Sequence, residues 1–270
     1  MSEETEQGRA SEGVPAEQQR GGGGGTPSKS RLTGAVVFLS GANRGLGRVL
    51  AEQLLDADVA KLYAAARRLD SLDEVVALDP ERVTPVGLDT TAHGAVDAAA
   101  ELAADTTLLI NNAGVAAFAP GLTAPPEDVA REMATNFGGT YAMVRAFAPV
   151  IEGNGGGAIV NVLSMAGLAA IPPLAGYSAS KAAAHSMTQA VRAELRPRGV
   201  SVHGVYPAGI GTEMLAHESI PHSSPEEVAA GILAGVEKGE EDIFPCALSS
   251  AEAAIWWADP KGLEHRHTGH

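Results

Sequence analysis

Short runs of consecutive apolar residues alternate along the chain with longer segments in which apolar residues recur with helical spacing. The continuous runs predict buried β-strands at residues 35–40, 61–66, 83–89, 107–111, 157–164, 200–207 and 242–245. The periodic segments predict α-helices at residues 45–56, 90–105, 126–151, 177–195 and 224–239. Because strands that are apolar throughout need cover on both faces, this alternation favours an α/β fold built on a parallel sheet.

The chain has 270 residues, of which 45% are hydrophobic, and this suffices for one sizeable core in a single domain. Residues 1–30 are polar and include the uninterrupted run Gly21–Gly25, so we expect a disordered tail there. We also expect a flexible C-terminal tail at residues 261–270, which leaves residues 31–260 as the folded domain.

A formal net charge of −14 gives the chain no general attraction to nucleic acid or to an anionic membrane surface. Cys246 is the single cysteine, so an intrachain disulfide cannot form, as is usual in a reducing compartment. No apolar run approaches the ~18 residues that a membrane span requires. We therefore expect a soluble cytoplasmic protein with neither nucleic acid nor membrane as a partner.

The first predicted strand leads directly into the sequence SGANRGLG, from Ser40 to Gly47. Glycines at positions 41, 45 and 47 let the backbone turn sharply and approach a pyrophosphate, which the N-terminus of the next helix can bind. An ordinary tight turn would also use glycines. Three further predicted strands end at the same edge of the sheet, on the sequence NNAG (111–114), on Ser164 and on the sequence PAGIGT (207–212). Ligands bind at this edge in doubly wound sheets, which favours a nucleotide site.

Arg67 directly follows the second predicted strand, at the position that faces the adenosine ribose in nucleotide-binding sheets. A carboxylate there would favour NAD(H), whereas an arginine suits a 2′-phosphate. Arg44, inside the glycine turn, is a second candidate for that phosphate, although either arginine could be a solvated surface residue. We therefore predict NADP(H) as the cofactor. Asp89 ends the third strand and is expected either to bind the adenine or to cap the next helix.

Tyr177 and Lys181 lie four residues apart in the sequence GYSASKAAAHS, so a helix places them on the same face. An ammonium group beside a phenol stabilises the phenolate and is expected to lower the pKa of the tyrosine. This pair therefore predicts a general acid and base for reducing a carbonyl group.

These motifs, in this order, resemble those of the classical short-chain dehydrogenase/reductase family over roughly residues 32–245. They are SGANRGLG, NNAG, Asn136 in TNFGGT, Ser164, YSASK and PAGIGT. The resemblance implies a Rossmann-type, doubly wound parallel sheet of seven strands and a homodimer or homotetramer. It implies a catalytic tetrad of Asn136, Ser164, Tyr177 and Lys181, in which Asn136 bends its helix and holds a water that relays protons to Lys181. The chain departs from the family where Ser40 replaces the usual threonine and where Ala208 separates Pro207 from Gly209.

The residues expected to bind NADP(H) come from the strand ends and from the tetrad. They are Gly41, Asn43, Arg44, Gly45, Leu46, Gly47, Arg67, Asp89, Asn112, Ala113, Gly114, Tyr177, Lys181, Pro207, Gly209, Ile210 and Thr212. The residues expected to bind substrate are Val115, Phe118, Met165, Leu174 and Met214. We expect no metal site.

The substrate-binding residues are apolar, and the sequence places no arginine among them to bind a carboxylate or phosphate. The predicted function is therefore NADPH-dependent reduction of a neutral, largely hydrophobic ketone or aldehyde, or oxidation of the matching alcohol. Two alternatives remain open: an epimerase or dehydratase that uses the same tetrad, and a regulatory protein that senses NADP(H) without turnover.

Overall fold

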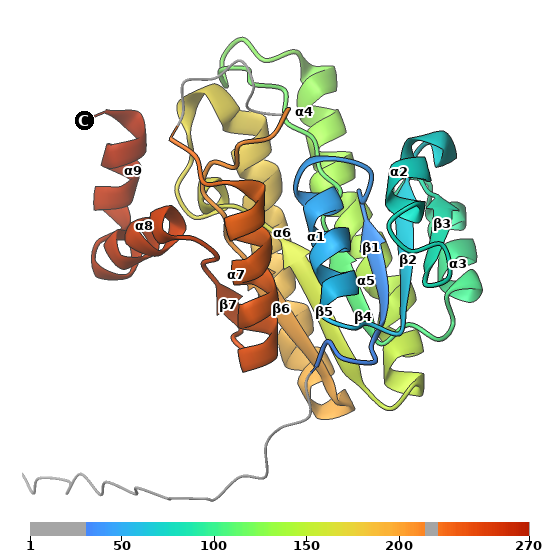
Figure 1. Ribbon diagram of the computed structural model, residues 1–270. Helices are drawn as coiled ribbons and strands as arrows, with labels where there is room; N and C mark the ends of the chain where they lie inside the picture. Colours follow the sequence, from blue (N-terminus) through green and yellow to red (C-terminus); the bar gives the residue numbers. More distant parts are fainter. Residues whose placement is uncertain (1–30, 214–220, 270) are drawn as a thin grey trace, which may run out of the picture.

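A single parallel sheet of seven strands, in the order β3-β2-β1-β4-β5-β6-β7, forms the centre of the molecule (Figure 1). The computed structural model describes residues 31–213 and 221–269, so the expected N-terminal tail and Met214 lie outside the described residues. The strands are β1 (Val36–Ser40), β2 (Lys61–Ala66), β3 (Val83–Gly87), β4 (Leu108–Asn111), β5 (Gly157–Val162), β6 (Val200–Val205) and β7 (Asp242–Ile243). The α/β fold and the Rossmann-type doubly wound sheet expected from the sequence are confirmed.

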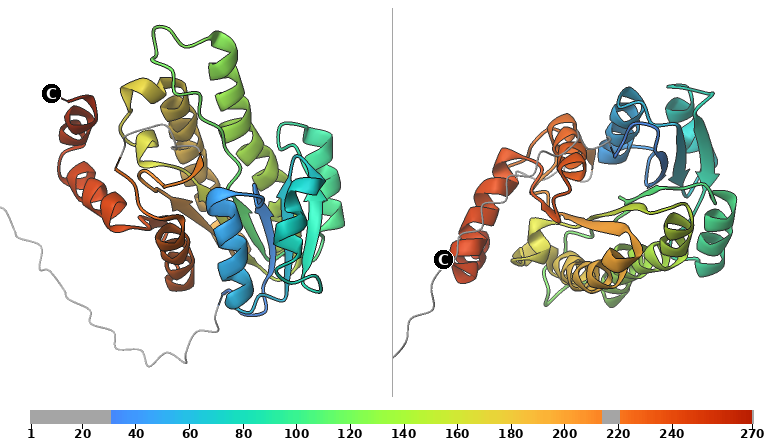
Figure 2. Two further views of the ribbon diagram at one scale, coloured as in Figure 1. Left: turned by 45° about the horizontal axis from the view of Figure 1, so that its top comes forward. Right: turned by 90° about the horizontal axis from the view of Figure 1, so that it is seen from below.

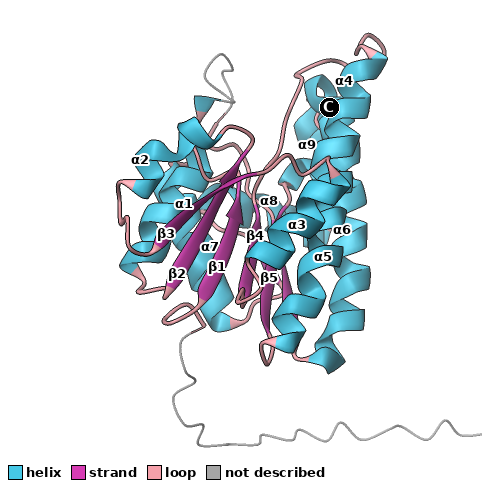
Figure 3. Ribbon diagram, turned by 90° about the vertical axis from the view of Figure 1, so that its right-hand side faces the viewer, coloured by secondary structure: helices cyan, strands magenta, loops and turns pink. Residues whose placement is uncertain are grey.

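Helices cover both faces of the sheet (Figure 3). One face carries α1 (Gly45–Asp56), α2 (Asp73–Val76) and α7 (Pro225–Lys238), and the other carries α3 (His93–Leu102), α5 (Thr140–Gly153) and α6 (Ala175–Leu195). Successive side chains of a strand point to opposite faces of the sheet. Val37 and Leu39 therefore pack in the core beneath α1 and α7, and Phe38 packs in the core beneath α3 and α5. All three are fully buried, which explains why β1 is apolar throughout.

The helix expected at residues 126–151 forms as three consecutive segments. These are α4 (Pro126–Glu132), a π-helical segment, η2 (Met133–Gly139), and α5. The remaining short helical turns are η1 (Leu69–Leu72), η3 (Met165–Gly167), η4 (Pro172–Leu174) and η5 (Arg196–Arg198). Ser224 caps α7 as expected, since its side chain accepts a hydrogen bond from the backbone N–H of Glu227 at 3.1 Å.

The expectation of a flexible tail at residues 261–270 is wrong for the part that the structure describes. Two helices end the chain, α8 (Ala247–Ala258) and α9 (Pro260–Thr268), and both lie beside the segment that follows β5 (Figure 2). The Asp259 side chain accepts a hydrogen bond from the Lys261 N–H and so caps α9, and Leu263 is fully buried against the molecule. The pattern of apolar residues missed α9 because Leu263 is its one large apolar residue.

Within the described ranges no helix combines the length and apolarity needed to cross a bilayer. The side chains of His, Cys, Asp and Glu in these ranges form no group of three that is placed to hold a metal ion.

Candidate active site

A cavity of about 1350 Å³ opens at the carboxyl edge of the sheet. The ends of β1, β2, β4, β5 and β6 contribute to its walls, as expected for a doubly wound sheet. Each residue expected to bind the cofactor lines this cavity, and so do Ser164 of the tetrad and four of the five residues expected to bind substrate. The fifth, Met214, is outside the described residues.

The glycine turn between β1 and α1 forms one end of the cavity. Gly45 has a φ of +51°, a conformation that a side chain would strain. Ser40 and Asn112 tie this turn to the end of β4: the backbone N–H of Asn112 donates to Ser40 Oγ at 3.1 Å, and Asn112 Nδ2 donates to the Gly41 carbonyl at 3.0 Å. No side chain caps the N-terminus of α1, so its first N–H groups are left for a ligand.

We expect Gly47→Ala to destabilise the protein and to weaken dinucleotide binding. A Cβ atom at this position would lie 1.9 Å from the Gly41 carbonyl oxygen and 2.7 Å from Asn112 Nδ2, so the turn would have to open. Overpacking of this kind costs about 1–3 kcal/mol. Thermal denaturation with and without NADPH measures the effect.

Gly94→Ala is the matched control, because Gly94 has open space around its Cα and lies in helix α3. Alanine is the better helix former there, so the control is expected to melt at or above the wild-type temperature. A Gly47→Ala variant with the wild-type melting temperature and NADPH affinity would contradict the role of Gly47.

Three arginines lie around the part of the cavity that follows β1 and β2, and they differ in their partners. Arg44 forms a salt bridge with Glu213 at 2.7 Å, and Arg68 forms one with Asp70 at 3.0 Å. Arg67 forms no hydrogen bond or salt bridge with any residue in 31–213 or 221–269, although it helps to lower the pKa of Asp89. Arg67 is therefore the arginine whose guanidinium is available to an anionic ligand.

Asp89 lines the cavity but has local partners. Its Oδ1 accepts hydrogen bonds from the backbone N–H of Thr91 at 2.9 Å and from the Thr91 hydroxyl at 2.8 Å. These bonds are the main reason that the pKa of Asp89 lies below its usual value. Asp89 therefore stabilises the turn that precedes α3 but does not cap that helix, whose N-cap residue Ala92 has no side-chain hydrogen bond, and adenine binding stays a prediction.

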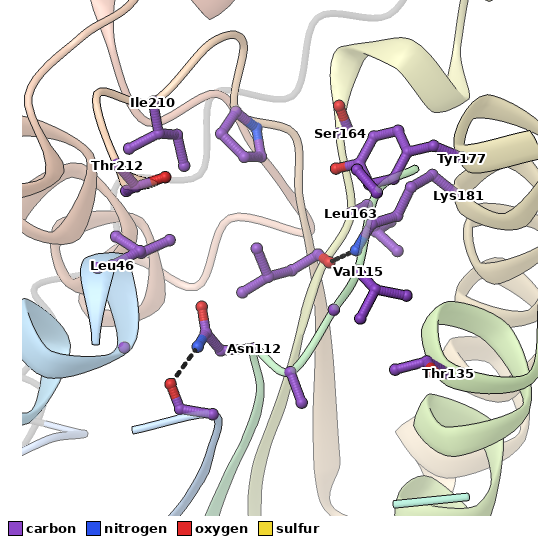
Figure 4. Close-up of a pocket in the computed structure, with 18 of the residues that line it drawn as sticks. Leu46, Asn112, Val115, Thr135, Leu163, Ser164, Tyr177, Lys181, Ile210 and Thr212 are labelled. Atoms are coloured by element: carbon purple, nitrogen blue, oxygen red, sulfur yellow. Dashed lines mark hydrogen bonds between the residues drawn. The ribbon is translucent and has the colours of Figure 1, made fainter. Parts of the chain in front are cut away.

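Ser164, Tyr177 and Lys181 meet on one wall of the cavity, and Figure 4 shows Ser164 beside the Tyr177 ring with Lys181 below it. The Lys181 ammonium donates to the Val162 carbonyl at 2.7 Å and lies 5.6 Å from the centre of the Tyr177 ring. Ser164 Oγ accepts a hydrogen bond from the Ala166 N–H at 3.1 Å, so its own hydrogen can be donated to the Tyr177 oxygen or to a ligand.

Burial sets the acidity of this pair. Burial raises the pKa of Tyr177 to about 12, the Glu132 carboxylate adds to the rise, and the hydrogen bond with Ser164 opposes it. Burial also disfavours the charged form of Lys181, and this lowers the pKa of its ammonium group to about 8. The pKa of Tyr177 thus lies above its ordinary value because of burial, and the lowering expected from Lys181 stays a prediction. Tyr177 keeps its proton at neutral pH, which is the state that a proton donor requires.

Asn136 lies behind the cavity wall and is not among the residues that line it. It sits in the π-helical segment, and its side chain is fully engaged: Oδ1 accepts from the Val115 N–H, and Nδ2 donates to the Val115 carbonyl and to Ser180 Oγ, each at 2.9 Å. The expected distortion of the helix is present. The side chain itself holds the segment after β4 against α6, and the expected proton relay through a water stays a prediction.

The substrate end of the cavity contains polar residues that the sequence analysis did not assign to it. They are Arg131 of α4, Glu252 of α8, and Arg266 and His267 of α9. The expected substrate-binding residues include no arginine, but the structure adds Arg131 and Arg266 to the cavity, and Arg131 is paired with Asp128 at 2.8 Å. The polar composition of residues 261–270 predicts a tail, so the sequence carries no signal that places Arg266 and His267 here. Phe118, as expected, lines the wall; its φ of +51° is unusual for a bulky residue.

Comparisons with known proteins agree with this geometry. The profile of the short chain dehydrogenase family matches residues 35–221. A short chain dehydrogenase from Burkholderia cenocepacia, solved in complex with NADP, is 42% identical with a TM-score of 0.83, covering 88% of this chain and 98% of that one. A short chain dehydrogenase/reductase from Burkholderia phymatum, in complex with NAD, is 26% identical with a TM-score of 0.76, covering 86% of this chain and 95% of that one.

Among characterised relatives, a galactitol 2-dehydrogenase (L-tagatose-forming) from Cereibacter sphaeroides is 34% identical over 190 residues, which is 68% of this chain and 74% of the relative. Three observations lead to the same conclusion. They are the extent of the family match, the seven-stranded sheet, and the cavity wall on which Ser164, Tyr177 and Lys181 lie together. This chain belongs to the short-chain dehydrogenase/reductase family of oxidoreductases.

Proposed function

We propose that the protein uses NADPH to reduce the carbonyl group of a neutral, largely apolar small molecule, or catalyses the reverse reaction. The observation that carries this proposal is the position of the Tyr177 phenol at the cavity wall, beside Ser164 and one helical turn from Lys181. A phenol held in this position can donate a proton to a developing alkoxide.

The residues around the glycine turn fit a dinucleotide with a 2′-phosphate. The uncapped N-terminus of α1 and the close approach at Gly47 suit a pyrophosphate, and the unpaired Arg67 suits the additional phosphate. The Burkholderia cenocepacia relative with NADP supports this choice, while the more distant relative with NAD shows that both cofactors occur among similar proteins. When bound, the nicotinamide supplies the hydride for the reaction.

Each residue on the wall has a distinct task. Tyr177 donates its proton to the substrate oxygen, and Ser164 donates a hydrogen bond to that same oxygen as negative charge develops. Lys181, anchored on the Val162 carbonyl, holds a positive charge close to the ring and stabilises the phenolate that remains. Asn136 keeps the segment after β4 in place, so that Val115 lines the cavity.

We also propose that the protein works as a homodimer or homotetramer, as the family resemblance implies, and that it works in the cytoplasm, as its single cysteine suggests. The molar mass in solution, measured by light scattering on the full chain, tests the assembly.

A panel of ketones, aldehydes and alcohols, assayed with NADPH, NADH, NADP⁺ and NAD⁺, tests the proposed function. We expect carbonyl-dependent loss of NADPH absorbance that is faster than with NADH. Conversion of substrate without net change in the cofactor would instead identify an epimerase or dehydratase. Tight NADPH binding with no conversion of any compound would identify a sensor.

A further inference from the structure

Helices α8 and α9 bring three polar side chains to a cavity whose substrate end is otherwise largely apolar. Glu252 comes from α8, and Arg266 and His267 come from α9. Met165, Ile171 and Leu248 line the same cavity. In such a pocket, a few polar groups among apolar walls fix the orientation of a ligand and select it.

His267 is held firmly by the segment that follows β5. Its Nδ1 lies 3.0 Å from the Ala169 carbonyl oxygen, which can only accept, so Nδ1 carries a hydrogen. The other nitrogen, Nε2, lies 3.6 Å from Glu252 Oε2. The neighbouring Glu252 carboxylate is the main cause of a raised pKa at His267, and the Ala169 carbonyl adds to it.

Glu252 has accepting capacity that the described part of the protein does not use. Its side chain is 14% exposed, and that of His267 is 8% exposed, so water has little access to the pair. The distance of 3.6 Å is longer than a direct hydrogen bond, and no other described residue donates to this carboxylate. A largely buried carboxylate needs hydrogen-bond donors to offset its lost hydration. A ligand bound in the cavity can supply such a donor to Glu252.

The charges of the residues that line this part of the cavity determine which ligand group can donate to Glu252. Arg266 lines the same cavity without a salt bridge to any described residue, and its positive charge acts on the neighbouring His267. A cationic ligand group would be repelled by Arg266, and an anionic group would be repelled by Glu252. A neutral hydroxyl group can donate to the carboxylate and accept from the guanidinium or imidazole.

We propose that Glu252, His267 and Arg266 form a hydroxyl-binding subsite, so that the substrate is a carbonyl compound with an apolar body and a hydroxyl group distant from the carbonyl. This inference rests on the proposed carbonyl reduction. It changes the expected substrate from a simple hydrophobic ketone to a hydroxylated one. Glu252 is then the residue that discriminates between the two.

The test uses a homologous series of straight-chain methyl ketones and the same ketones with a terminal hydroxyl group, assayed with NADPH. A hydrogen bond to a charged group contributes about 1.5–3 kcal/mol, which is roughly a ten- to hundredfold effect. We therefore expect wild type to favour the hydroxylated member of the best-fitting pair by about tenfold or more in kcat/KM. In Glu252→Leu this ratio is expected to fall to about one, with an intermediate ratio in Glu252→Gln.

Glu264→Leu is the matched control, because Glu264 lies on α9, is paired with Lys261 at 2.6 Å and does not line the large cavity. This variant is expected to keep the wild-type ratio. If Glu252→Leu does not fold, as judged by its melting curve, Glu252→Gln carries the test, because its side chain has the same shape.

Equal kcat/KM values for hydroxylated and parent ketones throughout the series in wild type would overturn the subsite, and so would a preference that survives in Glu252→Leu. If no ketone is reduced, the proposed function fails but the subsite is still tested by calorimetry on the protein saturated with NADP⁺. In that experiment the diols must bind more tightly than the corresponding alcohols, and the difference must disappear in Glu252→Leu. Equal binding of diols and alcohols would overturn the subsite independently of turnover.

Discussion

Tyr177→Phe is expected to lower kcat for carbonyl reduction by about a hundredfold or more, while NADPH affinity stays close to that of wild type. The phenyl ring keeps the shape of the side chain but has no proton to give to the substrate oxygen. Steady-state kinetics with the best substrate of the panel, together with NADPH binding followed by fluorescence, measure both quantities.

Tyr141→Phe is the matched control for this substitution. Tyr141 is 46% exposed and does not line the cavity, so loss of its hydroxyl group is expected to leave kcat unchanged. A Tyr177→Phe variant that retains more than about a tenth of the wild-type kcat would show that another group donates the proton.

Arg67→Ala is expected to reduce kcat/KM for NADPH by about ten- to a hundredfold and to leave kcat/KM for NADH nearly unchanged. Arg67 is the arginine after β2 without a described partner, and its charge-assisted hydrogen bonds would go to the 2′-phosphate, which NADH lacks. The double variant Ala66→Asp with Arg67→Ala should shift the cofactor preference further toward NADH than Arg67→Ala alone, because a carboxylate near the ribose repels the 2′-phosphate.

Arg68→Ala provides the comparison for Arg67, since Arg68 is the next residue, lines the same cavity and is already paired with Asp70 at 3.0 Å. Its removal is expected to change the cofactor preference little. Similar kcat/KM values for NADPH and NADH in wild type would refute the assignment of Arg67. An Arg67→Ala variant whose kcat/KM for NADPH equals that of wild type would also refute it.

The sheet could be predicted from the sequence because each strand is a short, continuous apolar run, and burial on both faces demands such runs. The cavity could be predicted because the carboxyl ends of parallel strands meet at one edge, which brings Gly47, Asn112, Ser164 and Pro207 together although they are far apart in the chain. The positions of Tyr177 and Lys181 on the same wall could be predicted because residues four apart lie on the same face of a helix.

Other features depend on contacts that no local pattern encodes. Helix α9 is held by a cap and one buried leucine, so its polar composition resembled that of a tail, and the subsite with His267 was missed with it. The pKa of Tyr177 is raised mainly by burial, which is a property of the whole fold. Likewise, the pairing of Arg44 with Glu213 links two distant loops and leaves Arg67 as the stronger candidate for the phosphate.

The most direct test of the central claim, hydride transfer from NADPH to a carbonyl carbon with Tyr177 as the proton donor, is to follow an isotope. NADPH carrying deuterium at the transferred position is incubated with the best carbonyl substrate, and the alcohol is analysed by mass spectrometry. The proposed function predicts one deuterium on the carbinol carbon for each NADPH oxidised, with formation of labelled alcohol slowed about a hundredfold or more in Tyr177→Phe. Product without deuterium, or an undiminished rate in Tyr177→Phe, would contradict it.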